Sequence, residues 1–236
     1  MPMDANTAKL QEWIHASKYT VAITGAGIST AAGIPDMKHL NLPSTLHMMS
    51  ETLLKATPNH YYKGVYKGFL KAMYENGPTI THQKLSELEA KSLLHGIITT
   101  NLDCLHSLAG SQNVAEIQGS FAVNICLGCG REYSDPFLWS HGSCPKCQMC
   151  GGALSIYPVH SHVGLLNCDV QKAREWISKA ELVIVIGSNG PYSGVYYDYV
   201  KPSAKIVQIN PKHTAFDSVA ILNIRKSTDE VFGLIS

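Results

Sequence analysis

Five of the seven cysteines lie close together, between Cys126 and Cys150. Two pairs have the spacing Cys-x-x-Cys, Cys126 with Cys129 and Cys147 with Cys150, and neighbouring glycines allow turns that aim two thiolates at one ion. Clustered cysteines in a chain without an export signal favour metal over disulfides. The spacing therefore predicts a structural zinc ion held by four thiolates, with no open coordination position.

The second pair has an alternative, because Cys144-x-x-Cys147 has the same spacing. We prefer Cys147 with Cys150, since Gly151 and Gly152 follow directly and favour a turn at that point. A set of reduced thiols without metal is the competing interpretation, and the paired spacing argues against it.

A glycine-rich segment, Gly25-Ala26-Gly27-Ile28-Ser29, follows a short apolar run and indicates a second site. Glycines let a backbone approach a pyrophosphate closely, and a helix N-terminus offers N–H donors to it. The order strand, glycine turn and helix is typical of nucleotide binding, although a plain tight turn uses the same residues. Asp36 follows in a rigid loop, as a ligand-binding carboxylate or as a solvated cap.

A third group of polar residues, Asn101 and Asp103, follows the apolar run at residues 96–99. Ligands bind at the carboxyl ends of the strands of a parallel sheet. There an asparagine can both donate and accept, and a carboxylate can hold an amide or a hydroxyl. An Asx turn leading into the next segment explains the same two residues equally well.

A sheet must position these groups, and five apolar runs predict its strands: residues 19–24, 96–99, 114–117, 182–186 and 206–209. Apolar periodicity predicts helices over residues 6–16, 81–94 and 169–180, the last capped by Asp169. Strands that are apolar throughout and alternate with helices indicate a parallel sheet covered on both faces. The predicted fold class is therefore α/β with a doubly wound parallel sheet.

Two stretches interrupt this alternation and predict a smaller domain inserted into the first. Residues 37–80 are rich in Met, His, Tyr and Pro and predict loops with short helices, while residues 124–165 carry the cysteines. The larger domain then consists of residues 1–36, 81–123 and 166–236. We expect a ligand cleft between the two domains, since such sites favour domain junctions.

The composition excludes several classes of protein. Of 236 residues, 45% are hydrophobic and 16% are charged, which describes a globular chain able to bury a core of its own. A net charge of +1 without a basic run argues against nucleic acid or an anionic membrane as the main partner. The segment MPMDANTAKL has an acidic residue and no apolar core, so we expect no signal peptide and a cytoplasmic location.

Taken together, five segments resemble the sirtuin family in type and order. They are Gly25-Ala26-Gly27-Ile28-Ser29 continuing to Gly33-Ile34-Pro35-Asp36, Thr99-Thr100-Asn101-Leu102-Asp103 with Leu105-His106, the paired cysteines with Gly151-Gly152, Gly187-Ser188-Asn189, and Ile209-Asn210. The resemblance covers nearly the whole chain. It implies an NAD-consuming enzyme with a Rossmann-like large domain and a small domain made of a zinc module and helices.

The resemblance also implies roles for single residues. Asn101 and Asp103 would line the pocket from which nicotinamide is expelled, and the loop after Gly27 would close over NAD. The adenosine half would rest on residues 187–189 and Asn210. The full NAD-binding set that the resemblance implies is Gly25, Ala26, Gly27, Ile28, Asp36, Met37, Asn101, Asp103, Gly187, Ser188, Asn189 and Asn210.

One departure from the family pattern falls on the catalytic base. In sirtuins a histidine in a Glu/Val-x-His-Gly segment takes a proton from a ribose hydroxyl, and that position here holds Gln118. Glutamine can orient a ribose but has no titratable nitrogen near neutral pH, so it is no general base. Three histidines are candidate substitutes, although a solvated or core role is the simpler interpretation of each: His106, His160 and His162.

We therefore predict NAD-dependent deacylation of lysine in an acylated protein, with Asn101, Asp103 and Gln118 as the catalytic residues. Transfer of ADP-ribose to an acceptor protein is the alternative, because a glutamine at the Gln118 position also occurs in the macrodomain-linked sirtuin class. Two other classes stay open: an NAD glycohydrolase, in which water is the acceptor, and a non-catalytic sensor that binds NAD or ADP-ribose.

Overall fold

The computed structural model describes residues 3–34, 46–47, 50–156, 167–190 and 194–236. Its strands are β1 (Thr20–Thr24), β2 (Gly96–Thr99), β3 (Val114–Glu116), β4 (Val123–Cys126), β5 (Glu132–Ser134), β6 (Leu154–Ile156), β7 (Leu182–Ile186), β8 (Lys205–Ile209) and β9 (Leu222–Ile224). Its α-helices are α1 (Ala5–Ala16), α3 (Glu51–Ala56), α4 (Pro58–Val65), α5 (Ile80–Ala90), α6 (Leu105–Leu108), α7 (Asn167–Lys179) and α8 (Thr228–Phe232). The remaining helical turns, of the 3-10 or π type, are η1 (Ala26–Ile28), η2 (Thr30–Ala32), η3 (Tyr66–Leu70), η4 (Ala72–Asn76), η5 (Tyr197–Tyr199) and η6 (Ala215–Ser218).

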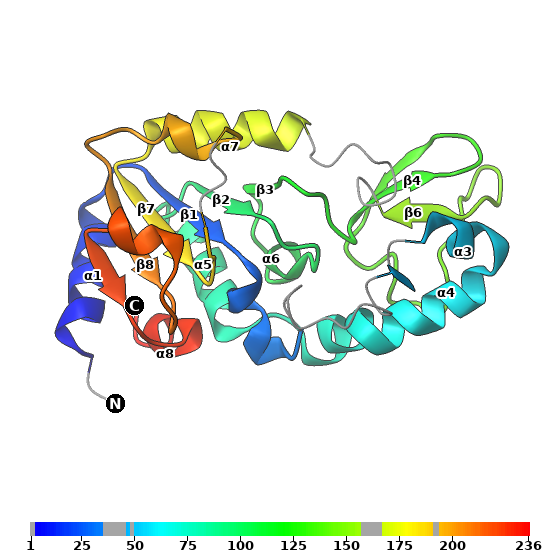
Figure 1. The fold of residues 1–236 in the computed structure, drawn as a ribbon, viewed down its shortest axis with the longest axis horizontal. Helices are drawn as coiled ribbons and strands as arrows, with labels where there is room; N and C mark the ends of the chain where they lie inside the picture. Colours follow the sequence, from blue (N-terminus) through cyan, green and yellow to red (C-terminus); the bar gives the residue numbers. More distant parts are fainter. Residues whose placement is uncertain (1–2, 35–45, 48–49, 157–166, 191–193) are drawn as a thin grey trace.

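Six parallel strands form the larger sheet, in the order β3-β2-β1-β7-β8-β9 (Figure 1). The chain first builds outward from β1 through β2 to β3, and then returns to the other side of β1 with β7. The carboxyl ends of β1 and β7 therefore form a topological switch point, which is where open α/β sheets bind ligands.

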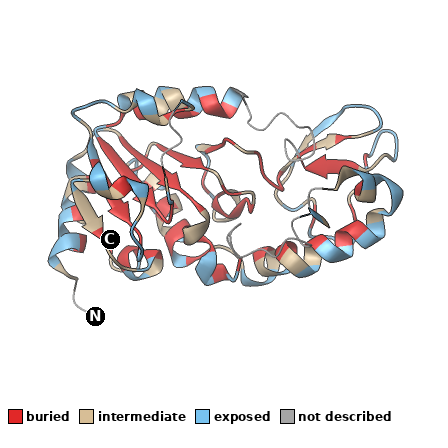
Figure 2. Ribbon diagram, viewed as in Figure 1, coloured by how far each residue is buried: buried red, intermediate tan, exposed pale blue. Residues whose placement is uncertain are grey.

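Both faces of this sheet are covered, as the apolar strands require. On one face Leu10 of α1, Leu85 of α5 and Phe232 of α8 pack against alternate strand residues such as Ile184. On the other face α7 packs Ala173 and Ile177 against the intervening residues, so the strands are buried along their length (Figure 2). The predicted α/β fold with a doubly wound parallel sheet is confirmed.

A smaller antiparallel sheet, β5-β4-β6, lies at the far end of the molecule beside α3 and α4 (Figure 1). The segment 58–76 is helical nearly throughout, as α4 runs on into η3 and η4. Aromatic side chains from this segment pack with residues of the cysteine-bearing stretch, for example Tyr61 and Tyr62 with Trp139. The two stretches predicted as insertions thus share one core, while the exact domain boundaries stay a prediction.

Three local predictions were incomplete or wrong. The helix predicted over residues 81–94 ends at Ala90, and Ser92 just beyond it has a φ of +58°. Strand β9 was not predicted, because it has three residues and only Ile224 is fully buried. Asp169 does not cap α7: the helix begins at Asn167, and Asp169 lies inside its first turn with Lys172 as ion-pair partner at 2.7 Å. Within the described residues, the structure contains no helix long and apolar enough to cross a membrane.

Candidate active site and metal centre

The glycine loops after β1 and β7 cross at the switch point in backbone contact. Gly27 N–H donates to the carbonyl of Gly187 at 2.9 Å, and Gly25 N–H donates to that of Ile186 at 3.1 Å. A Cβ on Gly27 would lie 2.7 Å from Gly187 atoms, and Gly187 has a φ of +59°. The two loops can therefore pack on each other only with glycine at these positions. This requirement is additional to the predicted role of the glycines, which is to let the backbone approach a ligand closely.

A buried network of side chains lies beside this crossing. The Ser29 hydroxyl donates to Oδ2 of Asp103 at 2.6 Å, and Nδ2 of Asn101 lies 3.3 Å from Ser29 Oγ and 3.2 Å from the carbonyl oxygen of Gly25. Burial raises the pKa of the Asp103 carboxyl above its ordinary value, while the bonds from Ser29 and the Leu105 N–H oppose that shift. Asn101 and Asp103 are thus held rigidly on the loop that connects β2 to α6.

Gln118 lies at the same edge of the sheet, beyond the carboxyl end of β3, the strand next to β2. The register pairs Thr99 with Glu116, so Asn101 and Gln118 each follow a paired residue by two positions. Gln118 is half-buried and lies in a turn that Gly119 closes with a φ of +73°. The structure thus places Asn101 and Gln118, two of the three predicted catalytic residues, after the ends of neighbouring strands.

Glu116 lies directly before this turn and is a buried carboxyl that sequence reasoning missed. Burial raises its pKa to about 7, although the Ser120 hydroxyl donates to Oε2 at 2.7 Å and opposes the shift. Its place at a strand end, two residues before Gln118, was visible in the sequence, but its burial was not.

His106 is a core residue, which confirms the simpler of the two interpretations. Its Nε2 lies 2.9 Å from Oγ1 of Thr24, and its ring lies 4.6 Å from that of His82. Burial lowers the pKa of His82 to about 3 and that of His106 well below its ordinary value. His82 in turn contacts Thr79, whose hydroxyl donates to the carbonyl of Ile28 at 3.3 Å. The histidine pair therefore supports β1 and the loop that follows it, beneath the network of Ser29, Asn101 and Asp103. Neither ring is placed to act as the catalytic base.

The loops after β7 and β8 are joined by polar contacts on the other side of the switch point. Nδ2 of Asn210 donates to the carbonyl of Ser188 at 3.2 Å, and Ala215 N–H donates to that of Asn189 at 3.1 Å. Ser188 and Asn210 are buried, so these loops are fixed before any ligand arrives.

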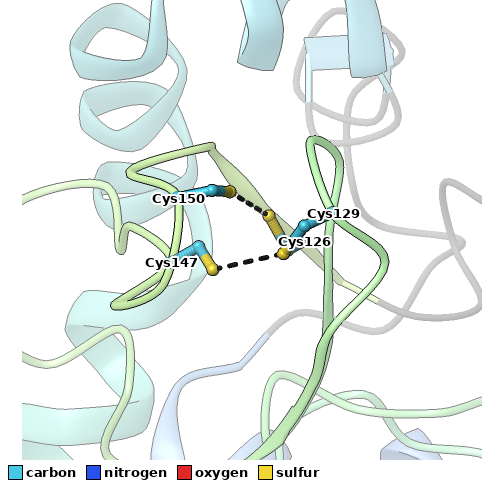
Figure 3. A group of neighbouring side chains, drawn as sticks. All are labelled: Cys126, Cys129, Cys147 and Cys150. Carbon is cyan, nitrogen blue, oxygen red and sulfur yellow. Dashed lines mark hydrogen bonds between the residues drawn. The ribbon is translucent and has the colours of Figure 1, made fainter.

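The cysteine thiols converge between two matching turns at the end of the small sheet (Figure 3). The sulfur atoms of Cys126, Cys129, Cys147 and Cys150 all lie within 4.8 Å of one another. Two of the separations are 3.4 and 3.6 Å, close to the about 3.8 Å that tetrahedral zinc–sulfur bonds of about 2.3 Å require and far from a disulfide bond of about 2.05 Å. The four thiols fit a structural zinc ion.

The turn geometry decides between Cys144 and Cys150. Gly130 N–H donates to the carbonyl of Cys126, and Gly151 N–H donates to that of Cys147, both at 2.9 Å. Both glycines also have φ near +74°, so the two pairs are equivalent turns. Cys144 lies instead in the apolar core, where burial raises the pKa of its thiol to about 11.

Comparison with known proteins agrees with this arrangement. The model of the Sir2 family matches residues 25–192. An NAD-dependent protein deacetylase of Clostridium perfringens (strain 13 / Type A) is 33% identical over 246 aligned positions, which cover 99% of each chain. The chain belongs to the Sir2 family.

Two solved Sir2-family structures extend the likeness to three dimensions. One, named "The Structural basis of Sirtuin Substrate Affinity", matches with a TM-score of 0.81 and 27% identity over 100% of this chain and 98% of that one. Another, a Sir2 protein with a p53 peptide and NAD+, matches with a TM-score of 0.73 and 27% identity over 98% and 96% of the two chains.

In this Sir2-family chain, the structure brings most of the predicted NAD-binding residues to one sheet edge. Asp36 and Met37 lie outside the described residues, as do His160 and His162, and the NAD-binding roles of the whole set stay predictions. Sequence reasoning did not single out Ser29, although it stood in the glycine segment. Its hydroxyl links Asn101 to Asp103 across 72 and 74 residues, a contact that only the fold creates.

Proposed function

We propose that this chain is an NAD-dependent protein deacylase that transfers an acyl group, acetyl first of all, from lysine to ADP-ribose and releases nicotinamide. The buried network of Ser29, Asn101 and Asp103 at the switch point is the observation that carries the proposal. Relatives named NAD-dependent protein deacetylases and a Sir2 structure with a p53 peptide and NAD+ support it.

Asn101 and Asp103 would act where nicotinamide leaves. Nδ2 of Asn101 already donates within the protein, so its Oδ1 is the atom that we assign to the ligand. As the acyl-lysine oxygen attacks the ribose carbon and nicotinamide departs with the bonding electrons, positive charge develops on the ribose. Dipoles and carboxyl groups that the fold already holds in place stabilise such charge, because they need not reorient during the reaction.

Gln118 would orient the ribose in the second step. There a ribose hydroxyl loses a proton and attacks the carbon that joins the acyl group to lysine. Glutamine can hydrogen-bond the hydroxyl but cannot take its proton near neutral pH. Loss of a positioned base typically lowers a rate by roughly 10²- to 10⁴-fold, so we expect slow deacylation.

Transfer of ADP-ribose to a protein is the second candidate, and Gln118 is the observation that favours it. Expulsion of nicotinamide needs no base, whereas deacylation does. A side chain of an acceptor protein would then form the bond to the ribose carbon, in place of the acyl-lysine oxygen.

We also propose that Cys126, Cys129, Cys147 and Cys150 hold a zinc ion that stabilises the small sheet. Four thiolates leave no coordination position for a substrate, so this ion would have no part in the reaction. A protein substrate is part of the same proposal, and the cytoplasmic location stays a prediction.

Product analysis separates the candidates. The purified chain is incubated with NAD alone, with NAD and an acetylated peptide, or with NAD and the same peptide lacking acetyl. Nicotinamide, ADP-ribose and its acetylated form are measured, together with the masses of peptide and protein. Nicotinamide release that requires the acetyl group, with acetyl moved to ADP-ribose, is the expected result. ADP-ribose attached to protein would favour the transferase, free ADP-ribose without a peptide would indicate a glycohydrolase, and NAD binding without release would leave a sensor.

A further inference from the structure

Tyr133 links the small sheet to the second cysteine turn. It lies on β5 directly opposite Asn124 of β4, the strand that ends at Cys126. Its hydroxyl oxygen lies 3.0 Å from Sγ of Cys147 and 3.0 Å from the backbone nitrogen of Gln148. One side chain therefore ties the strand pair that supplies Cys126 to the turn that supplies Cys147.

The direction of these two hydrogen bonds follows from the available protons. The Gln148 N–H can only donate, so the phenol oxygen accepts it. A thiolate that holds zinc carries no proton and can only accept, so with zinc bound the Tyr133 hydroxyl would donate to Cys147 Sγ. The same sulfur also accepts the Met149 N–H at 3.4 Å.

The two cysteine turns differ in this respect. Each supplies an amide donor by itself, since Gly128 N–H donates to Cys126 Sγ at 3.3 Å as Met149 N–H does to Cys147. The hydrogen bond from the Tyr133 hydroxyl is additional to these, and it comes from a separate strand. Cys147 thus receives a second hydrogen bond, from a hydroxyl that the Gln148 N–H holds in place.

We propose that Tyr133 is a positioning residue of the zinc site, whose hydroxyl proton fixes Cys147 on the metal and slows the loss of zinc. Four thiolates around a divalent ion carry excess negative charge, and a hydrogen bond to sulfur spreads that charge. Without the hydroxyl, Cys147 Sγ loses the donor that comes from the neighbouring strand, so the sulfur is held less firmly beside the ion. Removal of such an outer partner typically lowers metal affinity by about 10- to 100-fold.

Tyr133→Phe tests this, because it removes the hydroxyl and keeps the ring, which packs with Cys126 and Leu154 and lies below the Arg131 guanidinium. Tyr74→Phe is the matched control: Tyr74 is also half-buried in the small domain, and its hydroxyl donates to a carbonyl, that of Pro136, at 2.8 Å. The first readout is the rate at which full-length protein, loaded with one zinc, releases the ion to a coloured chelator. We expect about 10-fold faster release from Tyr133→Phe and the wild-type rate from Tyr74→Phe.

The second readout is the absorption of the cobalt(II)-substituted proteins. Loss of a hydrogen bond at one thiolate raises the energy of its electrons, so the sulfur-to-cobalt band of Tyr133→Phe moves to longer wavelength, while Tyr74→Phe matches wild type. Equal release rates and spectra for wild type and Tyr133→Phe would overturn the proposal. So would equal acceleration in both variants, because general loosening of the small domain would then explain it.

Discussion

The large sheet and the zinc module are stabilised in different ways. Strands β1 and β7 are buried along their whole length between helices on both faces, so their order follows from burial of aliphatic side chains. Around the cysteines, the buried apolar cluster of the described residues consists of Cys126, Cys147 and Leu154. Tyr133 and Leu138 also pack against this cluster, which is still far smaller than the core of the large sheet, so we expect metal ligation to stabilise the two turns.

This difference matters for where chemistry is possible. The switch point combines rigid backbone with buried polar side chains such as Asn101 and Asp103, which suits a reaction. The four cysteines of the small sheet would all be engaged in holding one zinc ion, so this module would act as a support.

Removal of a zinc ligand should have the largest effect. Cys147→Ser should lose the metal and the order of residues 126–154, because structural zinc in zinc-finger peptides contributes about 10–16 kcal/mol. Cys144→Ser, three residues away, should keep one zinc per chain, since Cys144 is packed in the aromatic core. Metal content and the near-ultraviolet circular dichroism of buried Trp139 provide the measurement. Zinc loss from Cys144→Ser with retention in Cys147→Ser would contradict the assignment.

The loop crossing should be the most sensitive point of the large domain. In Gly187→Ala, the new Cβ would lie 2.6 Å from backbone atoms of Gly27 and Ile28, at a φ of +59°. Overlap and left-handed strain together should cost about 3 kcal/mol and abolish stabilisation by NAD. Gly190→Ala adds a Cβ whose nearest neighbour is 3.9 Å away and should leave stability and the NAD-induced rise in Tm unchanged. Equal behaviour of the two variants would refute the crossing as the reason for glycine.

A smaller effect should come from the buried histidine pair. His82 takes up a proton near pH 6.5 when unfolded but only near pH 3 when folded, because its burial lowers the pKa. Its contribution to stability is therefore present above pH 6.5 and is lost as the pH falls, by about 2 kcal/mol between pH 6.5 and 5. Between pH 6.5 and 5, the free energy of unfolding should fall less for His82→Gln than for wild type. His15→Gln, which changes an exposed histidine, should follow wild type.

The contribution of the histidine pair to stability must be measured by comparing variants, since protonation of other groups changes stability in the opposite direction. Burial raises the pKa of Glu116 to about 7 and that of Asp103 above its ordinary value, so both favour folding more as the pH falls. Urea unfolding at pH 7.5, 6.5 and 5 provides the measurement. Parallel pH profiles for wild type and His82→Gln would exclude a neutral buried imidazole at this position.

The sequence predicted the parts of this molecule that have a local cause. Continuous apolar runs predicted β1, β2, β7 and β8 nearly to the residue, and the Cys-x-x-Cys spacing predicted the metal cluster. What it could not supply were contacts between distant segments. Ser29 with Asp103, and Tyr133 with Cys147, depend on sheet order and register. Strand β9 escaped notice because a short edge strand has little apolar pattern of its own.

We propose that the edge of the large sheet carries an NAD site in which Gln118 stands in place of the catalytic base. The most direct test is the rate of NAD-dependent deacetylation of a peptide by wild type, Gln118→His and Gln118→Asn. A restored base should raise the rate by roughly 10²-fold in Gln118→His, with no gain in Gln118→Asn, which keeps an amide. An unchanged rate in Gln118→His, with the protein folded and NAD bound, would exclude this role of Gln118 and show that the pocket no longer serves acyl-lysine.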